Sequence, residues 1–129
     1  STEELKVLVV DDHPLNRLLV SQIIQKNWPQ AQLVEAEDGG HAVEIMQERT
    51  FHVVLMDMVM PVMDGIEATR HIRQNMSAPA CDTPILGLTA NVNPIDKQRC
   101  IEAGMKEVLY KPLNKEVLIH HIEAILRRI

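Results

Sequence analysis

The 129-residue sequence predicts an α/β domain: a doubly wound, five-stranded parallel sheet with five helices. Short apolar runs rich in Val, Ile and Leu recur along the chain without clean polar alternation, as expected for strands that helices cover on both faces. Segments with helical spacing separate these runs, and Pro, Gly, Asn and Asp mark the boundaries. This alternation favours right-handed crossovers between parallel strands.

The first strand is predicted over residues 5–10, and it ends at Asp11-Asp12. Pro14 then opens a helix over residues 14–26, because proline is favoured in the first turn. The apolar residues of this helix cover a wider sector than a core-facing stripe needs, so some apolar surface is left over for a partner. These residues are Leu15, Leu18, Leu19, Val20, Ile23 and Ile24.

A weaker second strand is predicted over residues 32–36, followed by a turn and cap at 37–40 and a short helix at 41–48. The third strand is the buried run 53–57, which ends at Asp57 before a turn that contains Met60-Pro61. Gly65 opens a helix over residues 65–74. The chain is therefore built around a unit of strand, loop and helix that presents Asp57.

A polar loop is predicted at residues 75–83, and a fourth strand at 84–88 delivers Thr89 to the next loop. Asn93-Pro94 is a cap and proline that start a helix over 94–103, which has few apolar residues and ends at Gly104. A fifth strand follows at 106–110, and Lys111-Pro112 breaks it before a final helix over 114–128.

Composition restricts the class of protein. The length fits one domain, 1–129, and 46% apolar with 24% charged residues is an ordinary globular mixture. A net charge of -5 without a basic stripe argues against nucleic-acid binding, and no uncharged stretch reaches the length of a membrane span. Cys81 and Cys100 lack a CxxC spacing and are expected to be reduced thiols. Because the chain starts without Met, we expect it to be part of a longer protein.

Polar residues end four of the predicted strands: Asp11-Asp12, Asp57, Thr89 and Lys111. In doubly wound sheets ligands bind outside the carboxyl ends of the strands, so these side chains are expected to share one crevice. Three carboxylates repel one another there, and one lysine cannot offset that repulsion. A hard divalent cation can, and the oxygen ligands favour Mg²⁺ together with a phosphate.

A carboxylate can act as the nucleophile in phosphoryl transfer and form an acyl phosphate. The protein then positions the reacting groups in line and neutralises charge on the phosphoryl oxygens. Asp57 suits the first role, and Lys111 and Thr89 suit the second.

Several motifs, which together cover essentially the entire chain, resemble the receiver domain of two-component response regulators. They are Val9-Val10-Asp11-Asp12, Asp57-x-x-Met60-Pro61-x-Met63-Asp64-Gly65, Leu88-Thr89-Ala90, Ala103-Gly104 and Lys111-Pro112. Asn16-Arg17 and the run from Leu88 to Asn91 are most similar to receivers embedded in hybrid sensor histidine kinases. The resemblance implies the flavodoxin-like strand order 2-1-3-4-5 and a cis peptide bond before Pro112.

The resemblance also implies the roles of the site residues. Asp57 is expected to be the phosphoacceptor, and Asp12, Asp57 and the Val59 backbone carbonyl the Mg²⁺ ligands, with Asp11 acting largely through water. Lys111 is expected to contact the phosphoryl group, and Thr89 to bond it once it is attached.

The sequence departs from the family's pattern where many relatives carry an aromatic switch residue, three positions before the lysine. Val108 stands there, so coupling of Thr89 to a rotating aromatic ring is in doubt. Tyr110 lies on the same face of the strand, and whether it substitutes stays open. Val59 and Asn91, which flank the phosphoryl site, occupy positions that influence hydrolysis in this family.

The expected function is Mg²⁺-dependent transfer of a phosphoryl group from a phosphohistidine to Asp57. The domain would assist its own phosphorylation and dephosphorylation, and then switch partner interactions or pass the phosphate to a histidine phosphotransfer domain. The resemblance implies a histidine kinase or phosphotransfer partner that docks near the first helix and the site loops. We expect a cytoplasmic domain that contacts no membrane, within a parent sensor kinase anchored in the inner membrane if the protein is a hybrid. The oligomeric state stays open.

Three alternatives remain. A Mg²⁺-dependent aspartyl-phosphate phosphohydrolase commonly carries Asp-x-Asp, whereas Met58-Val59 follows Asp57 here. A nucleotide- or flavin-binding module would need a glycine-rich phosphate motif, and neither GxxxxGK nor GxGxxG occurs. An interaction domain that has kept the fold without phosphotransfer is the third alternative, and the intact acidic set argues against it.

Overall fold

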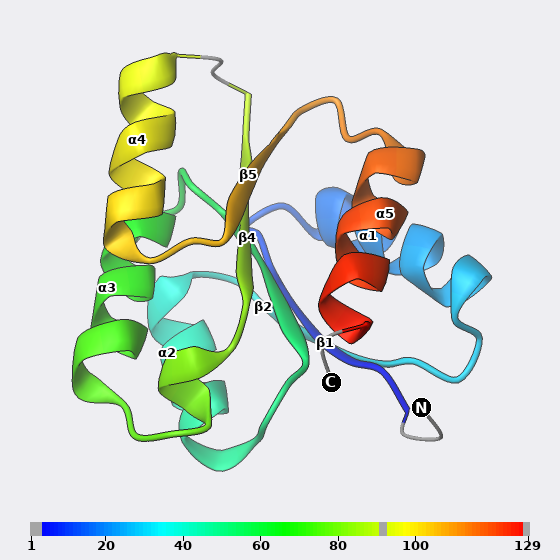
Figure 1. The fold of residues 1–129 in the computed structure, drawn as a ribbon, viewed down its shortest axis with the longest axis horizontal. Helices are drawn as coiled ribbons and strands as arrows, with labels where there is room; N and C mark the ends of the chain where they lie inside the picture. The colour runs from blue at the N-terminus through cyan, green and yellow to red at the C-terminus, as the bar shows by residue number, and fades with distance from the viewer. Residues whose placement is uncertain (1–3, 91–92, 128–129) are drawn as a thin grey trace.

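The computed structural model describes residues 4–90 and 93–127. Within them a five-stranded sheet is flanked by helices on both faces (Figure 1). The strands are β1 (Lys6–Val10), β2 (Gln32–Ala36), β3 (Val53–Asp57), β4 (Ile85–Thr89) and β5 (Glu107–Tyr110). The helices are α1 (Pro14–Asn27), α2 (Gly39–Glu48), α3 (Gly65–Asn75), α4 (Pro94–Ala103) and α5 (Lys115–Leu126), and a 3-10 turn, η1, spans Ala80–Asp82.

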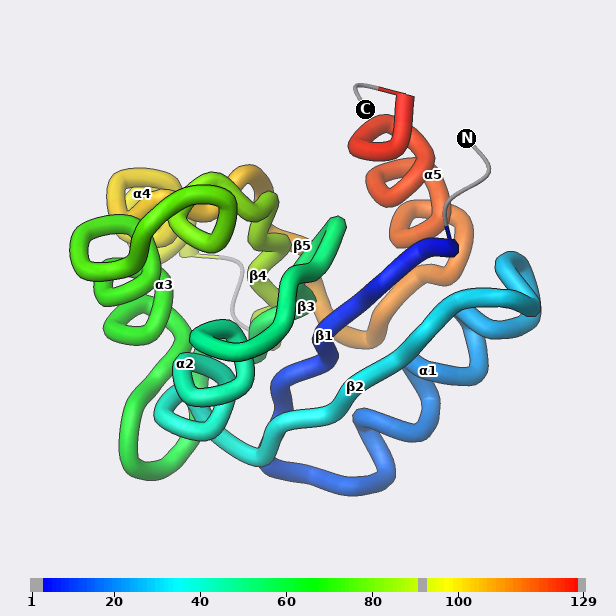
Figure 2. Tube along the Cα trace, turned by 90° about the horizontal axis from the view of Figure 1, so that it is seen from below, coloured from blue at the N-terminus to red at the C-terminus, as the bar shows by residue number. Residues whose placement is uncertain are grey.

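The sheet has the order β2-β1-β3-β4-β5 with every pair parallel, which confirms the predicted fold class and strand order. Helices α1 and α5 cover one face, and α2, α3 and α4 cover the other (Figure 2). Successive strand residues alternate between the two layers, so Val7 and Val9 pack toward α1 and α5 whereas Leu8 and Val10 pack toward α2 to α4. Burial on both faces explains why the strands read as continuous apolar runs.

The predicted boundaries hold to within a few residues, with one informative error. Helix α2 begins at Gly39 and not at His41, because the Asp38 carboxylate caps it by accepting a hydrogen bond from the His41 backbone N–H. The pair Gly39-Gly40 is therefore the first turn of the helix and not a separate turn. The loop predicted at 75–83 also contains the short 3-10 turn η1.

The predicted starts of α4 and α5 and the predicted end of α4 are confirmed. Asn93 and Asn114 cap α4 and α5 by accepting backbone N–H groups, and Gly104 ends α4 at a φ of 116° that favours glycine. Helix α5 ends at Leu126 with Arg127 as its C-cap, two residues before the predicted end at Arg128. Asn91 and Arg128 lie outside the described residues.

The leftover apolar surface predicted for the first helix is present. Leu15, Leu18 and Leu19 of α1 have exposed fractions of 64%, 50% and 51%. Cys81 and Cys100 are free thiols, as expected. Among the described residues, no helix has both the length and the apolar character that crossing a membrane requires.

Val62, in the loop between β3 and α3, has a φ of 69° and an exposed fraction of 88%. A β-branched residue is strained in this left-handed region, whereas glycine is not. We expect Val62→Gly to stabilise the protein by about 1 kcal/mol, since no buried contact is lost. Urea unfolding of the variant and the wild type would measure the difference in free energy of unfolding. Val59→Gly is the matched control, because Val59 is 79% exposed in the same loop outside the left-handed region. If the free energy of unfolding of Val62→Gly is equal to or lower than that of the wild type, this strain is absent.

Candidate functional site

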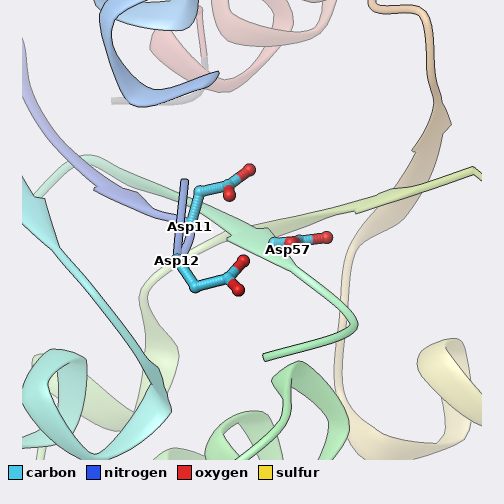
Figure 3. A group of neighbouring side chains, drawn as sticks. All are labelled: Asp11, Asp12 and Asp57. Atoms are coloured by element: carbon cyan, nitrogen blue, oxygen red, sulfur yellow. The ribbon is translucent and has the colours of Figure 1, made fainter. Parts of the chain in front are cut away.

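Three carboxylates gather at the carboxyl edge of the sheet. Asp11 and Asp12 follow β1, and Asp57 ends β3, the neighbouring strand. One ligand oxygen from each lies within 4.8 Å of the others, and the side chains point into the same space (Figure 3). Asp11 and Asp57 are buried, with exposed fractions of 2% and 5%, while Asp12 is half-buried. The expected convergence of these strand ends is therefore present.

The loop after β3 holds Asp57 in place through close backbone contacts. The Met58 N–H donates to the Leu88 carbonyl at 3.0 Å, and the Gly65 N–H donates to the Met58 carbonyl at 3.0 Å. A Cβ atom on Gly65 would lie 2.4 Å from the Asp57 carbonyl oxygen, so the chain can approach this closely because residue 65 is glycine.

Lys111 joins two of the three carboxylates. Its Nζ lies 3.2 Å from Asp57 Oδ1 and 3.6 Å from Asp11 Oδ2. Its backbone N–H donates to the Thr89 carbonyl at 2.8 Å, which places the lysine at the end of β5 beside β4. The peptide bond between Lys111 and Pro112 is cis, as the family resemblance implied.

Thr89 and Val59 complete the set of predicted site residues. Thr89 is buried at the end of β4, the strand next to β3. Val59 projects an exposed side chain, while its backbone N–H forms a hydrogen bond with the Asp57 carboxylate. The Val59 backbone, whose carbonyl was expected to be a Mg²⁺ ligand, therefore also helps to orient the Asp57 carboxylate through its N–H.

Burial raises the pKa of Asp57 above its ordinary value of 3.8, and the neighbouring Asp11 carboxylate raises it further. The Lys111 ammonium and its hydrogen bond lower that pKa, as does the Val59 backbone bond, but they do not cancel the increase. The ionised site therefore carries an excess of negative charge that favours binding of a cation.

The raised pKa predicts a gain in stability when Asp57 is neutralised. An acid whose pKa is higher in the folded than in the unfolded state destabilises the fold, and this penalty grows as pH rises from the unfolded pKa to the folded pKa and is complete above it. In the presence of a chelator, we expect Asp57→Asn to melt a few degrees higher than the wild type at neutral pH. Below the unfolded pKa the difference should vanish. Calorimetry across pH measures it, and a variant that melts lower at neutral pH contradicts the prediction.

The donor set fits Mg²⁺. Three carboxylates whose oxygens lie close together offer hard ligands without a thiolate or imidazole in the group, and Mg²⁺ takes one or two carboxylates while keeping several waters. Asp12 and Asp57 can supply such ligands, and a bound cation would offset the repulsion that Lys111 leaves.

Val108, at the position of the usual aromatic switch, is 4% exposed and faces the layer of α3 and α4. It pairs across the sheet with Gly87, and Met105 packs over this glycine: a Cβ atom on Gly87 would lie 2.5 Å from the Met105 sulfur. Methionine and valine thus fill this part of the core. Tyr110, two residues on, is half-buried.

A groove of about 810 Å³ lies between α1 and α5 and runs to the acidic cluster. Its walls are largely apolar, and Asp11 and Lys111 lie at its inner end. The apolar residues that line it include Leu19, Val20, Ile23, Leu113 and Ile119.

Arg17 contacts the site, although its place in the sequence predicts no such role. Its guanidinium donates a hydrogen bond of 2.7 Å to the backbone carbonyl of Asp11. This contact depends on how α1 packs beside β1 and β2, and the sequence carries no local signal for it.

A parallel doubly wound sheet with a carboxylate cluster and a lysine at its carboxyl edge is the arrangement expected of a two-component receiver domain. The model of the response regulator receiver domain family matches residues 7–123, and the chain belongs to this family.

Similar proteins agree with this assignment. The chain is 37% identical over 130 residues to sensor histidine kinase RcsC of Salmonella typhimurium, a match that covers 100% of the chain and 13% of that protein. It is also 37% identical over 123 residues to sensor protein EvgS of Escherichia coli, covering 95% of the chain and 10% of EvgS. The chain thus spans a small part of these relatives, and it is homologous to the receivers of hybrid sensor kinases.

Among solved structures, the receiver domain of sensor histidine kinase PA1611 from Pseudomonas aeruginosa has a TM-score of 0.83 and 30% identity. The match covers 95% of the present chain and 97% of that one. The PA1611 receiver holds a magnesium ion coordinated in its active-site cleft.

Proposed function

We propose that Asp57 of this receiver domain accepts a phosphoryl group from a phosphohistidine, in a reaction that requires Mg²⁺. The observation that carries the proposal is the joint placement of Asp57, two further carboxylates and Lys111 in one crevice. An Asp57 oxygen would attack phosphorus as the phosphorus–nitrogen bond of the donor breaks. The imidazole, already protonated at its other ring nitrogen, would leave as a neutral ring.

The chain's own residues would prepare this step. The Val59 N–H and Lys111 orient the Asp57 carboxylate, and the Lys111 ammonium is placed to neutralise charge on a phosphoryl oxygen. Thr89, buried at the end of β4, would donate its hydroxyl to the attached phosphoryl group. Asp12, Asp57 and the Val59 carbonyl would hold Mg²⁺, and Asp11 would act through water. The metal supplies charge neutralisation at the phosphoryl oxygens.

Intact-protein mass spectrometry tests the proposal. Incubation with phosphoramidate and Mg²⁺ should add the mass of one phosphoryl group, and a chelator should prevent the addition. Slow turnover of the bound phosphate is compatible with the proposal. Failure to acquire phosphate from phosphoramidate, or acquisition that is equally fast with a chelator, would refute it.

We further propose that a helical, histidine-bearing partner docks on α1. The exposed leucines of α1 lie beside the apolar groove that ends at Asp11 and Lys111. An amphipathic helix placed there would bury apolar surface that is otherwise exposed to water. Its phosphohistidine could then reach Asp57.

Leu19→Asp tests the docking surface, because Leu19 is exposed and lines the groove. We expect phosphotransfer from a histidine phosphotransfer domain, chosen because it phosphorylates the wild type, to slow by about tenfold, the effect of losing one apolar anchor. Phosphorylation by phosphoramidate should be unchanged, since that donor needs no docking.

The control is Ile101→Asp, which places the same charge on an exposed apolar residue of α4, in the opposite layer. It should leave both rates unchanged. Equal rates of protein-to-protein transfer in Leu19→Asp and the wild type would remove α1 from the docking surface.

We also propose that residues 1–129 form one receiver domain of a hybrid sensor histidine kinase. The similarity to RcsC and EvgS over a small part of their lengths supports this. A cytoplasmic position in a membrane-anchored parent, and onward transfer of phosphate to a histidine phosphotransfer domain, follow as part of the same proposal.

A further inference from the structure

Arg17 connects three elements beside the acidic cluster. It lies in the first turns of α1, and its Nη1 donates to the Asp11 carbonyl oxygen at 2.7 Å. Its Nε donates to Glu35 Oε1, on β2, at 2.8 Å. The Arg17 side chain is 14% exposed, whereas that of Glu35 is 49% exposed. The guanidinium is therefore largely enclosed, with a backbone acceptor at Asp11 and a side-chain acceptor at Glu35.

The Asp11 carbonyl belongs to the peptide that joins Asp11 to Asp12. Because this peptide is planar, its orientation helps to set the directions in which both carboxylates leave the chain. Other contacts hold the Asp11 end: its N–H donates to the Ala36 carbonyl at 3.1 Å, and its Oδ1 accepts from the His13 N–H at 2.9 Å. Arg17 holds the carbonyl, so it restrains the peptide plane itself.

The peptide between Asp11 and Asp12 is under electrostatic stress, because Asp11, Asp12 and Asp57 repel one another when ionised. Repulsion favours a rotation of the peptide that would move Asp12, the less buried of the adjacent pair, away from the cluster. A hydrogen bond from a charged donor opposes this rotation more strongly than one from a neutral donor.

We propose that Arg17 is a positioning residue of the Mg²⁺ site, which fixes the peptide between Asp11 and Asp12 so that both carboxylates stay directed at the metal. This inference rests on the proposed function, since it requires that the site binds Mg²⁺. Arg17 lies behind the ligands, does not touch the metal or the phosphoryl group, and acts through the Asp11 carbonyl.

Titration calorimetry with MgCl₂ tests the inference on the unphosphorylated protein. The wild type should bind one Mg²⁺, and Arg17→Ala should bind it about tenfold more weakly, which is typical for loss of a group that orients metal ligands. Arg17→Lys, which keeps the charge but can form one of the two bonds at a time, should lie between them. Glu35→Gln, which keeps an acceptor for Arg17, should bind close to wild-type strength.

Arg73→Ala controls for the loss of a half-buried guanidinium that donates to backbone carbonyls. Arg73 Nε and Nη2 donate to the Gly104 carbonyl at 3.0 and 2.8 Å, and Nη1 donates to the Cys81 carbonyl at 2.8 Å, away from the acidic cluster. This variant should lose stability but keep wild-type Mg²⁺ affinity. All titrations are run at a temperature where circular dichroism shows every variant folded.

The outcomes separate the two proposals. If the wild type binds no Mg²⁺, the proposed function fails and the inference fails with it. If the wild type binds Mg²⁺ and Arg17→Ala binds it equally well, the inference alone is overturned. It is also overturned if Arg17→Ala and Arg73→Ala lose affinity to the same extent, because the effect then reflects general destabilisation.

Discussion

Asp57→Asn is expected to abolish phosphorylation of the domain, from both phosphoramidate and a phosphohistidine partner. The substitution keeps the shape of the side chain but removes the nucleophilic carboxylate, and a carboxamide does not form an acyl phosphate. Intact-protein mass spectrometry after incubation with donor and Mg²⁺ should show the unmodified mass.

Asp38→Asn is the matched control. Asp38 caps α2, and asparagine caps a helix about as well as aspartate, so this variant should acquire phosphate like the wild type. If Asp57→Asn is phosphorylated at the wild-type rate, the phosphoacceptor is another residue.

Lys111→Met is expected to slow phosphorylation by phosphoramidate by about 10²-fold at saturating Mg²⁺. The loss of one preorganised charge that stabilises a transition state commonly has an effect of this size. Methionine keeps most of the length of the side chain but removes the ammonium that lies 3.2 Å from Asp57 Oδ1. Rapid-quench measurements of the modified fraction would give the rate.

Lys97→Met serves as its control, because Lys97 also pairs with a carboxylate, Glu107 at 3.4 Å, on α4 and β5. Its rate should match that of the wild type. If Lys111→Met also matches the wild type at saturating Mg²⁺, Lys111 orients Asp57 at most and does not stabilise the transferred group.

The strand ends could be predicted because their signals are local. An apolar run that stops at a carboxylate shows where a buried strand leaves the sheet, and parallel strands share one carboxyl edge. These two facts alone bring Asp11, Asp12, Asp57 and Lys111 together.

The features that escaped prediction depend on contacts between elements distant in sequence. The hydrogen bond from Arg17 to the Asp11 carbonyl requires the packing of α1 beside β2. On β2, Glu35 accepts a second hydrogen bond, from Arg17 Nε. The start of α2 escaped prediction for a local reason instead: Gly39-Gly40 suggests a turn, whereas the cap at Asp38 determines the helix start.

The surroundings of Val108, at the position of the usual aromatic switch residue, could not be predicted either. The sequence identified Val108 as a departure from the family's aromatic residue, but what surrounds it could be learned only from the packing. Gly87 on the neighbouring strand leaves room that the Met105 side chain fills. Met105 and Val108 therefore pack together in the layer between β5 and α4. A methionine side chain is flexible and adapts readily to small displacements of a helix.

Chemical trapping of the phosphorylated residue tests the central claim most directly. Reduction of an acyl phosphate with borohydride converts an aspartyl phosphate to homoserine, which tandem mass spectrometry locates in the sequence. After reaction with phosphoramidate and Mg²⁺, the account predicts homoserine at position 57. Homoserine at position 11 or 12, or a phosphate that resists borohydride on a hydroxyl or imidazole, would contradict it.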